Sequence, residues 1–340
     1  MLLLSKSICW RLSVILVFFV LALQGCFETK RVAVVEATVP DGLNSDVPLH
    51  PELEPIHFLK PPEVDPNQER AQGVSAGTRH GPFTVTPKNY KKGEWYGSDR
   101  DFWVYTQANY KQGDKPTVML VLDGHRVPDS LSLEPILDNL IAQKKLPPLI
   151  AIYLHTGVSK GQRDSQNRRW EMMRRNAEWA DYVFGEIMPE VKKRFTYDES
   201  GGWCAWGGSS SSVGAFSLAW YRPDKFSRVI GGSPSFVSLR VDRADDWVDA
   251  DKFKDLVMES DRSDLRVYLS TGYKDLTDED GPGDKVLTWA EVNIELARAL
   301  NARGHAWRFF FRADHDHGPT YLRRNITEAL LWTWAGHPLR

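Results

Sequence analysis

From residue 82 onward, short apolar runs alternate with amphipathic stretches. The first runs, FTVTP and Asp101–Thr106, have the alternation of half-buried strands and predict an antiparallel hairpin. Later runs are predominantly apolar without strict alternation, as is typical of parallel strands buried on both faces. They lie at Thr117–Gly124, Pro148–His155, Trp203–Gly208, Arg228–Ser235, Arg266–Gly272 and Trp307–Ala313.

The stretches between these runs have the spacing of helices. They are Leu131–Gln143, Glu178–Arg194, Val213–Tyr221, Trp289–Arg303 and Leu322–Trp334. Strands that alternate with helices predict an α/β fold, with a mostly parallel central sheet and helices on both faces. We expect one such domain over residues 76–340, without an internal repeat.

The N-terminus has the pattern of a secretory signal. Lys6 and Arg11 precede the apolar run Leu12–Leu23, which is too short for an ordinary membrane span. The run ends in Leu-Gln-Gly-Cys, which resembles the bacterial lipobox and implies removal of residues 1–25 and lipidation of Cys26. An uncleaved anchor or ordinary secretion is the alternative. Phe27 favours the outer membrane, so we expect a lipoprotein on the periplasmic or cell-surface side.

Residues 26–75 are rich in proline and acidic residues and show no sustained period. This composition predicts an extended tether, and an arm packed on the domain is the alternative. If the signal leaves with Cys9 and Cys26 is acylated, Cys204 is the one remaining cysteine and no intramolecular disulfide forms.

Composition narrows the function further. The chain has 340 residues, 42% of them hydrophobic, which is enough for a large buried core. The net charge is −2 and no basic run is present, so nothing points to nucleic acid. The 13 tryptophans indicate either a tryptophan-rich core or a groove lined by some of them.

Four predicted strands end in chemically reactive residues, and ligands bind at such carboxyl ends in α/β sheets. Trp203–Gly208 leads into a run of four serines. A nucleophile elbow has its serine on a tight strand-to-helix turn, between small residues two positions away on either side. Ser209 fits this pattern, although Ser210 and Ser212 fit on spacing alone and a plain serine-rich loop is the alternative.

A histidine loop and an acidic loop follow two later strands. The loop HDHG at residues 315–318 could bring a general base to the elbow. Asp275 lies three residues past Gly272, where it could orient the imidazole, and Asp278, Glu279 and Asp280 compete with it. The order serine, acid, histidine along the chain is that of α/β-hydrolases.

The fourth strand end is LDGHR, which follows the first central run. The backbone N–H of Gly124 or His125 could form an oxyanion hole together with the N–H of Ser210. A tight Asp-Gly turn is the structural alternative.

The stretch GGSSSSVGAFSLAWYRPDKFSRVIGGSPSF resembles the elbow region of the esterases related to enterochelin esterase, which include feruloyl and acetyl-xylan esterases. The resemblance extends over roughly residues 76–335. It implies an α/β-hydrolase fold with Ser209 as nucleophile. RVYLSTGYKDL implies Asp275 as the acid, and WRFFFRADHDHG implies His315 as the base, with His317 second.

RRWEMM at residues 168–173 resembles a loop near the active site of that family. The resemblance implies a supporting role for Arg169 and Glu171, and ordinary surface charge is the alternative. In one respect the chain departs from the family, because Ser211 and Ser212 occupy positions where glycines are usual. Side chains there could crowd the turn or the oxyanion hole.

The expected function is carboxylic ester hydrolysis outside the cytoplasm, through an acyl-enzyme on Ser209 and without a metal or organic cofactor. The resemblance implies acyl esters on polysaccharides or siderophore lactones as substrates. Two alternatives stay open. One is a binding protein that has kept the fold without the activity, and the other is a metal-dependent hydrolase that uses His315 and His317.

Overall fold

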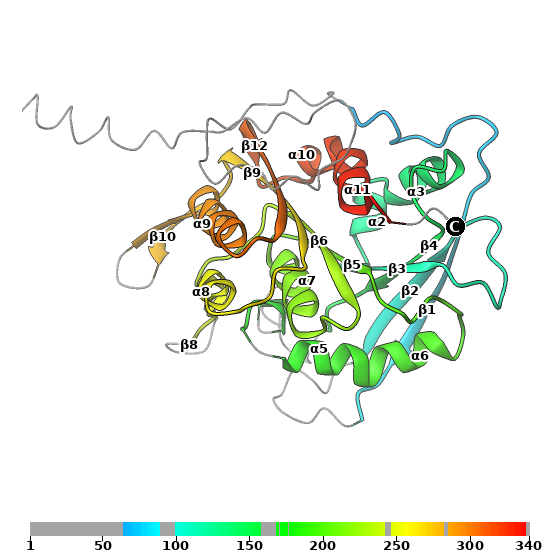
Figure 1. The fold of residues 1–340 in the computed structure, drawn as a ribbon, viewed down its shortest axis with the longest axis horizontal. Coiled ribbons are helices and arrows are strands. Elements are labelled where there is room, and N and C mark those ends of the chain that lie inside the picture. Colours follow the sequence, from blue (N-terminus) through cyan, green and yellow to red (C-terminus); the bar gives the residue numbers. More distant parts are fainter. Residues whose placement is uncertain are drawn as a thin grey trace, which may run out of the picture.

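The computed structural model describes residues 64–88, 99–157, 168–169, 171–175, 177–241, 246–281 and 285–337. Its centre is an eight-stranded sheet with the order β1-β2-β4-β3-β5-β6-β9-β12 (Figure 1). The strands are β1 (Thr78–Val85), β2 (Arg100–Thr106), β3 (Thr117–Leu122), β4 (Leu149–Leu154), β5 (Trp203–Gly208), β6 (Phe226–Gly232), β9 (Arg266–Lys274) and β12 (Ala306–Asp316).

The hydrophobic runs predicted the strands of this sheet. β1 pairs antiparallel with β2, and β2 pairs antiparallel with β4. From β4 to β12 every neighbouring pair is parallel. Every residue of β3 and β4 is buried, which explains why these runs contain no polar alternation. The predicted α/β fold with a mostly parallel sheet is confirmed.

Helices cover both faces of the sheet (Figure 1). On one face lie α5 (Glu178–Tyr182), α6 (Met188–Lys192), α7 (Ser210–Tyr221), α8 (Phe253–Met258) and α9 (Trp289–Ala302). On the other lie α2 (Val127–Ser130), α3 (Leu133–Ala142), α10 (Pro319–Arg324) and α11 (Ile326–Trp334). The stretch predicted as one helix over Glu178–Arg194 is interrupted by a π-helical turn, η2 (Val183–Ile187), between α5 and α6.

Two short hairpins extend from this core. One is formed by β7 (Arg240–Val241) and β8 (Asp246–Trp247), and it is followed by the 3-10 turn η3 (Ala250–Lys252). The other is formed by β10 (Thr277–Gly281) and β11 (Lys285–Thr288), directly between β9 and α9.

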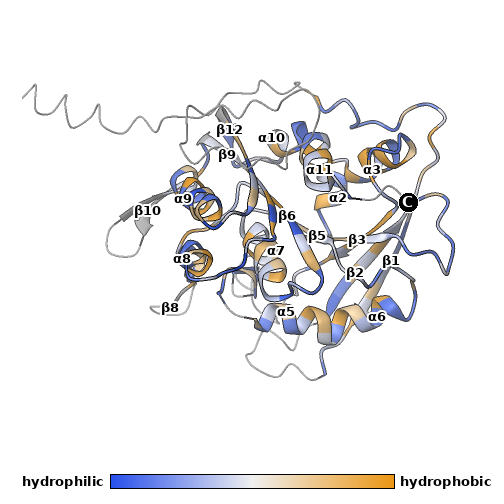
Figure 2. Cartoon of the chain, in the orientation of Figure 1, coloured by the Kyte–Doolittle hydropathy of each residue, from blue (hydrophilic) through white to orange (hydrophobic). Residues whose placement is uncertain are grey.

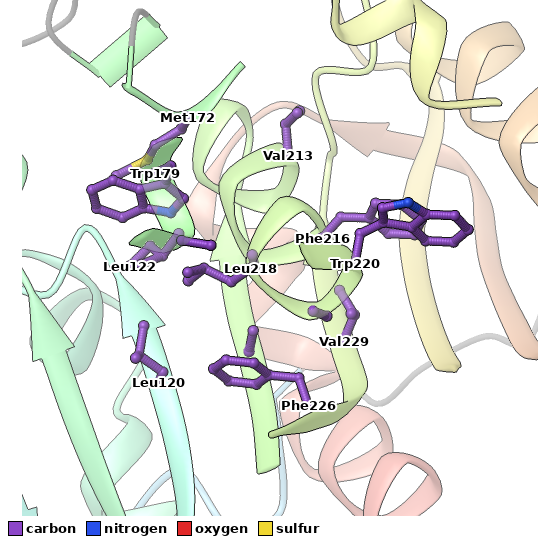
Figure 3. Close-up of a cluster of buried hydrophobic side chains, with 14 of the residues drawn as sticks. Leu120, Leu122, Met172, Trp179, Val213, Phe216, Leu218, Trp220, Phe226 and Val229 are labelled. Carbon is purple, nitrogen blue, oxygen red and sulfur yellow. The ribbon is translucent and has the colours of Figure 1, made fainter. Parts of the chain in front are cut away.

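Two hydrophobic clusters separate along the strands. Alternate residues of β3 point to opposite faces, with Leu120 and Leu122 in one cluster and Met119 and Val121 in the other. Figure 3 shows the first cluster, in which Phe216 and Leu218 of α7 lie among buried side chains of the neighbouring strands. Figure 2 shows hydrophobic segments, in orange, that recur along the helices packed against the sheet. Every residue of α7 except Tyr221 is buried, so the helix that begins at the serine run is closely packed along its length.

The segment before β1 packs on the domain. Asp65 is 2% exposed and accepts hydrogen bonds from the backbone N and hydroxyl of Thr327, at 2.8 and 2.6 Å. Arg70 forms an ion pair of 2.7 Å with the buried Asp138. Residues 64–75 therefore form a packed arm, which was the alternative to an extended tether. The prediction that the tether continues to residue 75 does not fit these residues.

The signal segment, Cys26 and tether residues 26–63 lie outside the described residues. Among the helices of the described ranges, none has the length and apolar character that crossing a membrane requires.

Candidate active site

The carboxyl ends of three neighbouring strands meet beside the serine run. Gly208 of β5 pairs with Gly232 of β6, and Gly232 pairs with Ser270 of β9. The loops that follow these strands, together with the loop after β12, carry the side chains described below. This is the edge of the sheet at which α/β proteins bind ligands.

Ser209 occupies a strained turn between β5 and α7. Its φ of 58° and ψ of −126° lie in a region that residues other than glycine rarely adopt. The backbone N of Ser209 donates a 2.7 Å hydrogen bond to the carbonyl oxygen of Gly232, which holds the turn against β6. A Cβ at Gly207 would lie 2.1 Å from the carbonyl oxygen of Ser211, so the close approach of strand and helix requires glycine there. These are the features of a nucleophile elbow.

Ser209, His317 and Asp275 form a hydrogen-bonded chain. Nε2 of His317 lies 2.8 Å from Oγ of Ser209. Nδ1 of the same imidazole lies 2.5 Å from Oδ1 of Asp275. The side chain of His317 is 23% exposed and that of Asp275 only 1%, so the chain runs from an accessible histidine to a buried carboxylate. This is the arrangement of a nucleophile, a general base and an orienting acid.

The surroundings of Asp275 keep its carboxylate ionised. Burial opposes ionisation, but hydrogen bonds from His317 and Thr271 outweigh it and lower the pKa of Asp275 below its usual value. Thr271 donates to Oδ2 at 2.5 Å, and the backbone N of Leu276 donates to Oδ1 at 2.8 Å. The carboxylate is therefore an acceptor that fixes the Nδ1–H tautomer of His317.

The prediction of His315 at the base position is wrong in its geometry. His315 is completely buried, and its Nε2 lies 3.2 Å from Oγ of Ser233 instead of Ser209. The reason is the length of β12, which continues to Asp316, three residues beyond the predicted end at Ala313. His315 is thus still a strand residue, whereas His317 is the first residue after the strand.

The backbone around Ser210 and Gly124 supplies the predicted oxyanion donors only in part. Ser210 is the first residue of α7, where backbone N–H groups have no intrahelical acceptor. The N–H of Gly124 instead donates a 2.7 Å hydrogen bond to the carbonyl oxygen of Leu154, so the prediction for Gly124 is corrected. His125 follows Gly124 in the turn after β3. The centre of its ring lies 4.0 Å from the centre of the His155 ring. The N–H of His125 therefore remains the predicted second donor of the oxyanion hole, beside the N–H of Ser210.

Ser211 and Ser212 do not crowd the turn. Both are buried in the first turn of α7 with their hydroxyls satisfied. Oγ of Ser211 donates to Oδ2 of Asp123 at 2.8 Å and accepts from the backbone N of Gly208 at 2.9 Å. Oγ of Ser212 donates to the carbonyl oxygen of Gly207 at 2.7 Å. The serines therefore add hydrogen bonds at positions where the family usually has glycines.

Sequence reasoning missed Arg168, which connects the elbow to the end of β3. Its Nη2 lies 2.6 Å from Oδ2 of Asp123 and 2.6 Å from the carbonyl oxygen of Gly208. Its Nε lies 2.8 Å from both carboxylate oxygens of Asp123. Burial disfavours the ionised form of Asp123, but the charge and hydrogen bonds of Arg168 outweigh it and lower its pKa.

Glu171 and Arg169, which were predicted to support the site, have contacts away from the elbow. Glu171 forms a buried ion pair with Arg100 of β2, whose guanidinium lies 5.6 Å from the ring centre of Tyr182. This pair fastens the segment after Arg168 to the sheet, and a supporting role of Glu171 in the site stays a prediction. Arg169 is partly buried, and its carbonyl oxygen accepts a 3.0 Å hydrogen bond from the backbone N of Met173. The arginine that reaches the elbow is its neighbour, Arg168.

The two histidines of the alternative metal site have separate partners. His315 faces Ser233, and His317 faces Ser209 and Asp275. Within the described ranges, no group of three or more His, Cys, Asp or Glu side chains is arranged to hold a metal ion.

Comparison with known folds identifies the architecture. Ferric enterobactin esterase from Salmonella typhimurium has a TM-score of 0.58 and 17% identity, with 80% of this chain and 62% of that one covered. A ferulic acid esterase from the anaerobic fungus Anaeromyces mucronatus has a TM-score of 0.55 and 14% identity, with 81% of this chain and 98% of that one covered. The chain thus spans less than two thirds of the enterobactin esterase but almost all of the ferulic acid esterase. At these identities the likeness shows the fold.

A comparison with protein families matches residues 94–333 to the family described as "Putative esterase". A search of curated proteins gives no match. The family match covers more than half of the chain and includes the elbow, the acid loop and the histidine loop. The chain therefore belongs to this esterase family and has the α/β-hydrolase fold.

Proposed function

We propose that the protein hydrolyses esters through a covalent acyl-enzyme on Ser209, with His317 as general base and Asp275 as its orienting acid. The observation that carries this proposal is the chain of two hydrogen bonds, 2.8 Å from Ser209 Oγ to His317 Nε2 and 2.5 Å from His317 Nδ1 to Asp275 Oδ1. The first distance is within the reach that a general base needs for proton transfer, and the second bond orients the imidazole.

In the acylation step, Oγ of Ser209 attacks the ester carbonyl carbon while its proton moves to Nε2 of His317. The tetrahedral intermediate places negative charge on the former carbonyl oxygen. We assign its stabilisation to the N–H groups of Ser210 and His125, and each such donor lowers the barrier by about 3 kcal/mol. The intermediate collapses when the alcohol leaves with the proton from His317.

Deacylation repeats these steps with water. His317 takes a proton from water as the water oxygen attacks the acyl carbon, and the bond from that carbon to Ser209 Oγ then breaks. Ser209 Oγ recovers its proton from His317, and the acid product departs. Asp275 holds the imidazole in one tautomer and stabilises its cationic form in both steps.

The mechanism is tested with p-nitrophenyl acetate and a fluorophosphonate probe. We expect the protein to hydrolyse the ester and the probe to label one residue, Ser209. Ser209→Ala should lose both the labelling and nearly all of the activity. A folded wild-type protein that is never labelled would show that the fold serves binding instead. Activity that survives Ser209→Ala and is abolished by a chelator would show a metal-dependent reaction.

We propose acyl esters on polysaccharides or siderophore-type lactones as substrates. The fold is shared with proteins named as ferulic acid esterase and enterobactin esterase, which supports both classes. A screen of feruloylated, acetylated and lactone substrates against the purified domain separates them by kcat/KM.

We also propose that the enzyme acts outside the cytoplasm, anchored by a lipid on Cys26. The support is the charged and apolar N-terminus followed by the lipobox-like Leu-Gln-Gly-Cys. We expect the full-length protein to fractionate with membranes and to incorporate labelled fatty acid. Cys26→Ala should lose the label, and a soluble, unlabelled wild-type protein would contradict the anchor.

A further inference from the structure

Ser209 Oγ has a second polar neighbour besides His317. Oγ of Ser235, in the loop after β6, lies 3.1 Å from it. Ser235 is 1% exposed, and its backbone N donates a 3.3 Å hydrogen bond to the carbonyl oxygen of Ser209. Nε1 of Trp289, the first residue of α9, lies 2.9 Å from Oγ of Ser235. The nucleophile is therefore hydrogen-bonded to a buried serine, which is in turn hydrogen-bonded to an indole.

The chemistry of the groups fixes the direction of every hydrogen bond in this chain. An indole N–H can only donate, so Ser235 Oγ accepts from Trp289. At the other end, the Asp275 carboxylate accepts from Nδ1–H of His317, which leaves Nε2 as the acceptor of the Ser209 proton. Because the Ser209 proton is used in this way, the bond between the two serines requires the proton of Ser235.

We propose that Ser235 is a further catalytic residue, which donates a hydrogen bond to the nucleophilic oxygen of Ser209. This inference rests on the proposed role of Ser209. Before reaction the bond leaves the Ser209 hydroxyl one orientation, toward His317. When His317 has taken the proton, Nε2–H and the Ser235 hydroxyl both donate to Ser209 Oγ. The negative charge that develops on Oγ as its proton leaves is thus stabilised by two donors.

The same donor acts when the acyl-enzyme is hydrolysed. As the bond between the acyl carbon and Ser209 Oγ breaks, its electron pair moves onto Oγ, which then takes the proton from His317. Ser235 stabilises that oxygen during bond breaking. We therefore expect Ser235 to accelerate both acylation and deacylation.

Trp289 acts through Ser235 and is a positioning residue. Its N–H occupies a lone pair of Ser235 Oγ, which directs the Ser235 proton toward Ser209. The indole also lies edge-on to the His317 ring, with ring centres 5.9 Å apart and planes at 85°. Asn293, one helical turn further along α9, donates to the carbonyl oxygens of Pro234 and Trp289, at 2.8 and 2.7 Å. The start of α9 is thus tied to the loop that carries Ser235.

The test is a double-mutant cycle with Ser235→Ala and Trp289→Phe, in which burst kinetics separate acylation from deacylation. Ser235→Ala should slow both steps by about tenfold, the effect of one hydrogen bond, with KM almost unchanged. Trp289→Phe keeps the ring and should slow both steps by about threefold. The double variant should be no slower than Ser235→Ala, because the indole acts only through the hydroxyl.

The control is Ser238→Ala, which removes a hydroxyl from the same loop. Oγ of Ser238 donates to Asp251 and not to the site, so both rates should match wild type. Unchanged rates in Ser235→Ala would overturn the role of Ser235, and additive losses in the double variant would overturn that of Trp289. If Ser235→Ala does not fold, an unchanged kcat in Trp289→Phe overturns the proposal that hydrogen bonds from Trp289 through Ser235 to Ser209 assist catalysis. Failure of the proposed function is a different result, since the wild type would then escape fluorophosphonate labelling.

Discussion

Arg168 and Asp123 form an ion pair directly behind the nucleophile turn, in which Nη2 of Arg168 lies 2.6 Å from Oδ2 of Asp123. The same guanidinium donates to the carbonyl oxygen of Gly208, the residue before Ser209, at 2.6 Å. Asp123 itself precedes the turn that contains His125. This partly buried pair thus links the turn that carries the nucleophile with the turn that contains the predicted second oxyanion donor.

Arg168→Ala should therefore reduce both stability and activity. It leaves the carboxylate of Asp123 buried without its counterion, which costs about 3–5 kcal/mol in comparable buried pairs. We expect a lower Tm and a kcat about 10 to 100-fold lower, since the elbow and the oxyanion turn lose their common anchor. Arg168→Lys should recover only part, because an ammonium cannot form the two-nitrogen contact.

The control for Arg168 is Arg175→Ala. Arg175 also pairs with an aspartate, Asp249, but at 3.8 Å and with both side chains partly exposed. Its loss should change Tm and kcat little. If Arg168→Ala and Arg175→Ala have equal kcat, the pair behind the elbow has no role in catalysis.

The positions of the strands were predictable because parallel strands buried on both faces are continuous apolar runs. β5, at Trp203–Gly208, was predicted residue for residue, and with it the place of the serine run. The resemblance then selected Ser209 within that run. The strand before Asp275 was predicted to end at Gly272 and continues to Lys274, and the resemblance selected Asp275 among the acids that follow it.

Other parts of the site depend on contacts that sequence spacing does not contain. The choice between His315 and His317 depends on where β12 stops pairing with β9, and its register shifts between Arg312 and Asp316. Ser235 lies 26 positions from Ser209 along the chain, and Trp289 lies a further 54 from Ser235. The one signal for Ser235 was its place as the last residue of the predicted strand Arg228–Ser235, whereas the observed strand β6 ends at Gly232 and leaves Ser235 in the loop.

His317→Ala and His315→Ala should have unequal effects. His317→Ala removes the proton acceptor of Ser209, and we expect kcat to fall by about 10⁴-fold or more. In His315→Ala the chain from Ser209 to Asp275 persists, so the loss should be about tenfold or less and should come with a lower Tm from the buried cavity. Steady-state kinetics and fluorophosphonate labelling rates check both. A larger loss of labelling in His315→Ala would return the base to His315.

Ser211→Gly tests the departure from the usual glycine. Oγ of Ser211 donates to Asp123 and accepts from the N–H of Gly208, and we expect its removal to cost about 1–3 kcal/mol of stability. Thermal unfolding at neutral pH should show a lower Tm, together with a lower kcat. A variant more active than wild type would mean that the serine side chain crowds the site.

His305 should make the protein less stable in mildly acidic solution. Burial, and then the charge of Arg262, lower the pKa of His305 to about 4. The imidazole is 1% exposed, and its Nδ1 accepts a 3.2 Å hydrogen bond from the backbone N of Leu265, so the folded protein holds the neutral form. The unfolded chain binds the proton near the ordinary pKa of about 6.5. Since the folded pKa is the lower one, this stability is complete above pH ~6.5 and is lost as the pH falls toward about 4.

His305→Gln keeps an acceptor for Leu265 but has no proton to gain. The wild type should lose on the order of 3 kcal/mol from this group between about pH 6.5 and 4, and the variant should lack that part of the decline. Chemical denaturation at a series of pH values measures both. At pH 8 the imidazole is neutral in the folded and unfolded states, so the difference there reports packing alone and is the internal reference. Parallel curves for the two proteins from pH 8 to pH 4 would show that His305 does not control the acid stability.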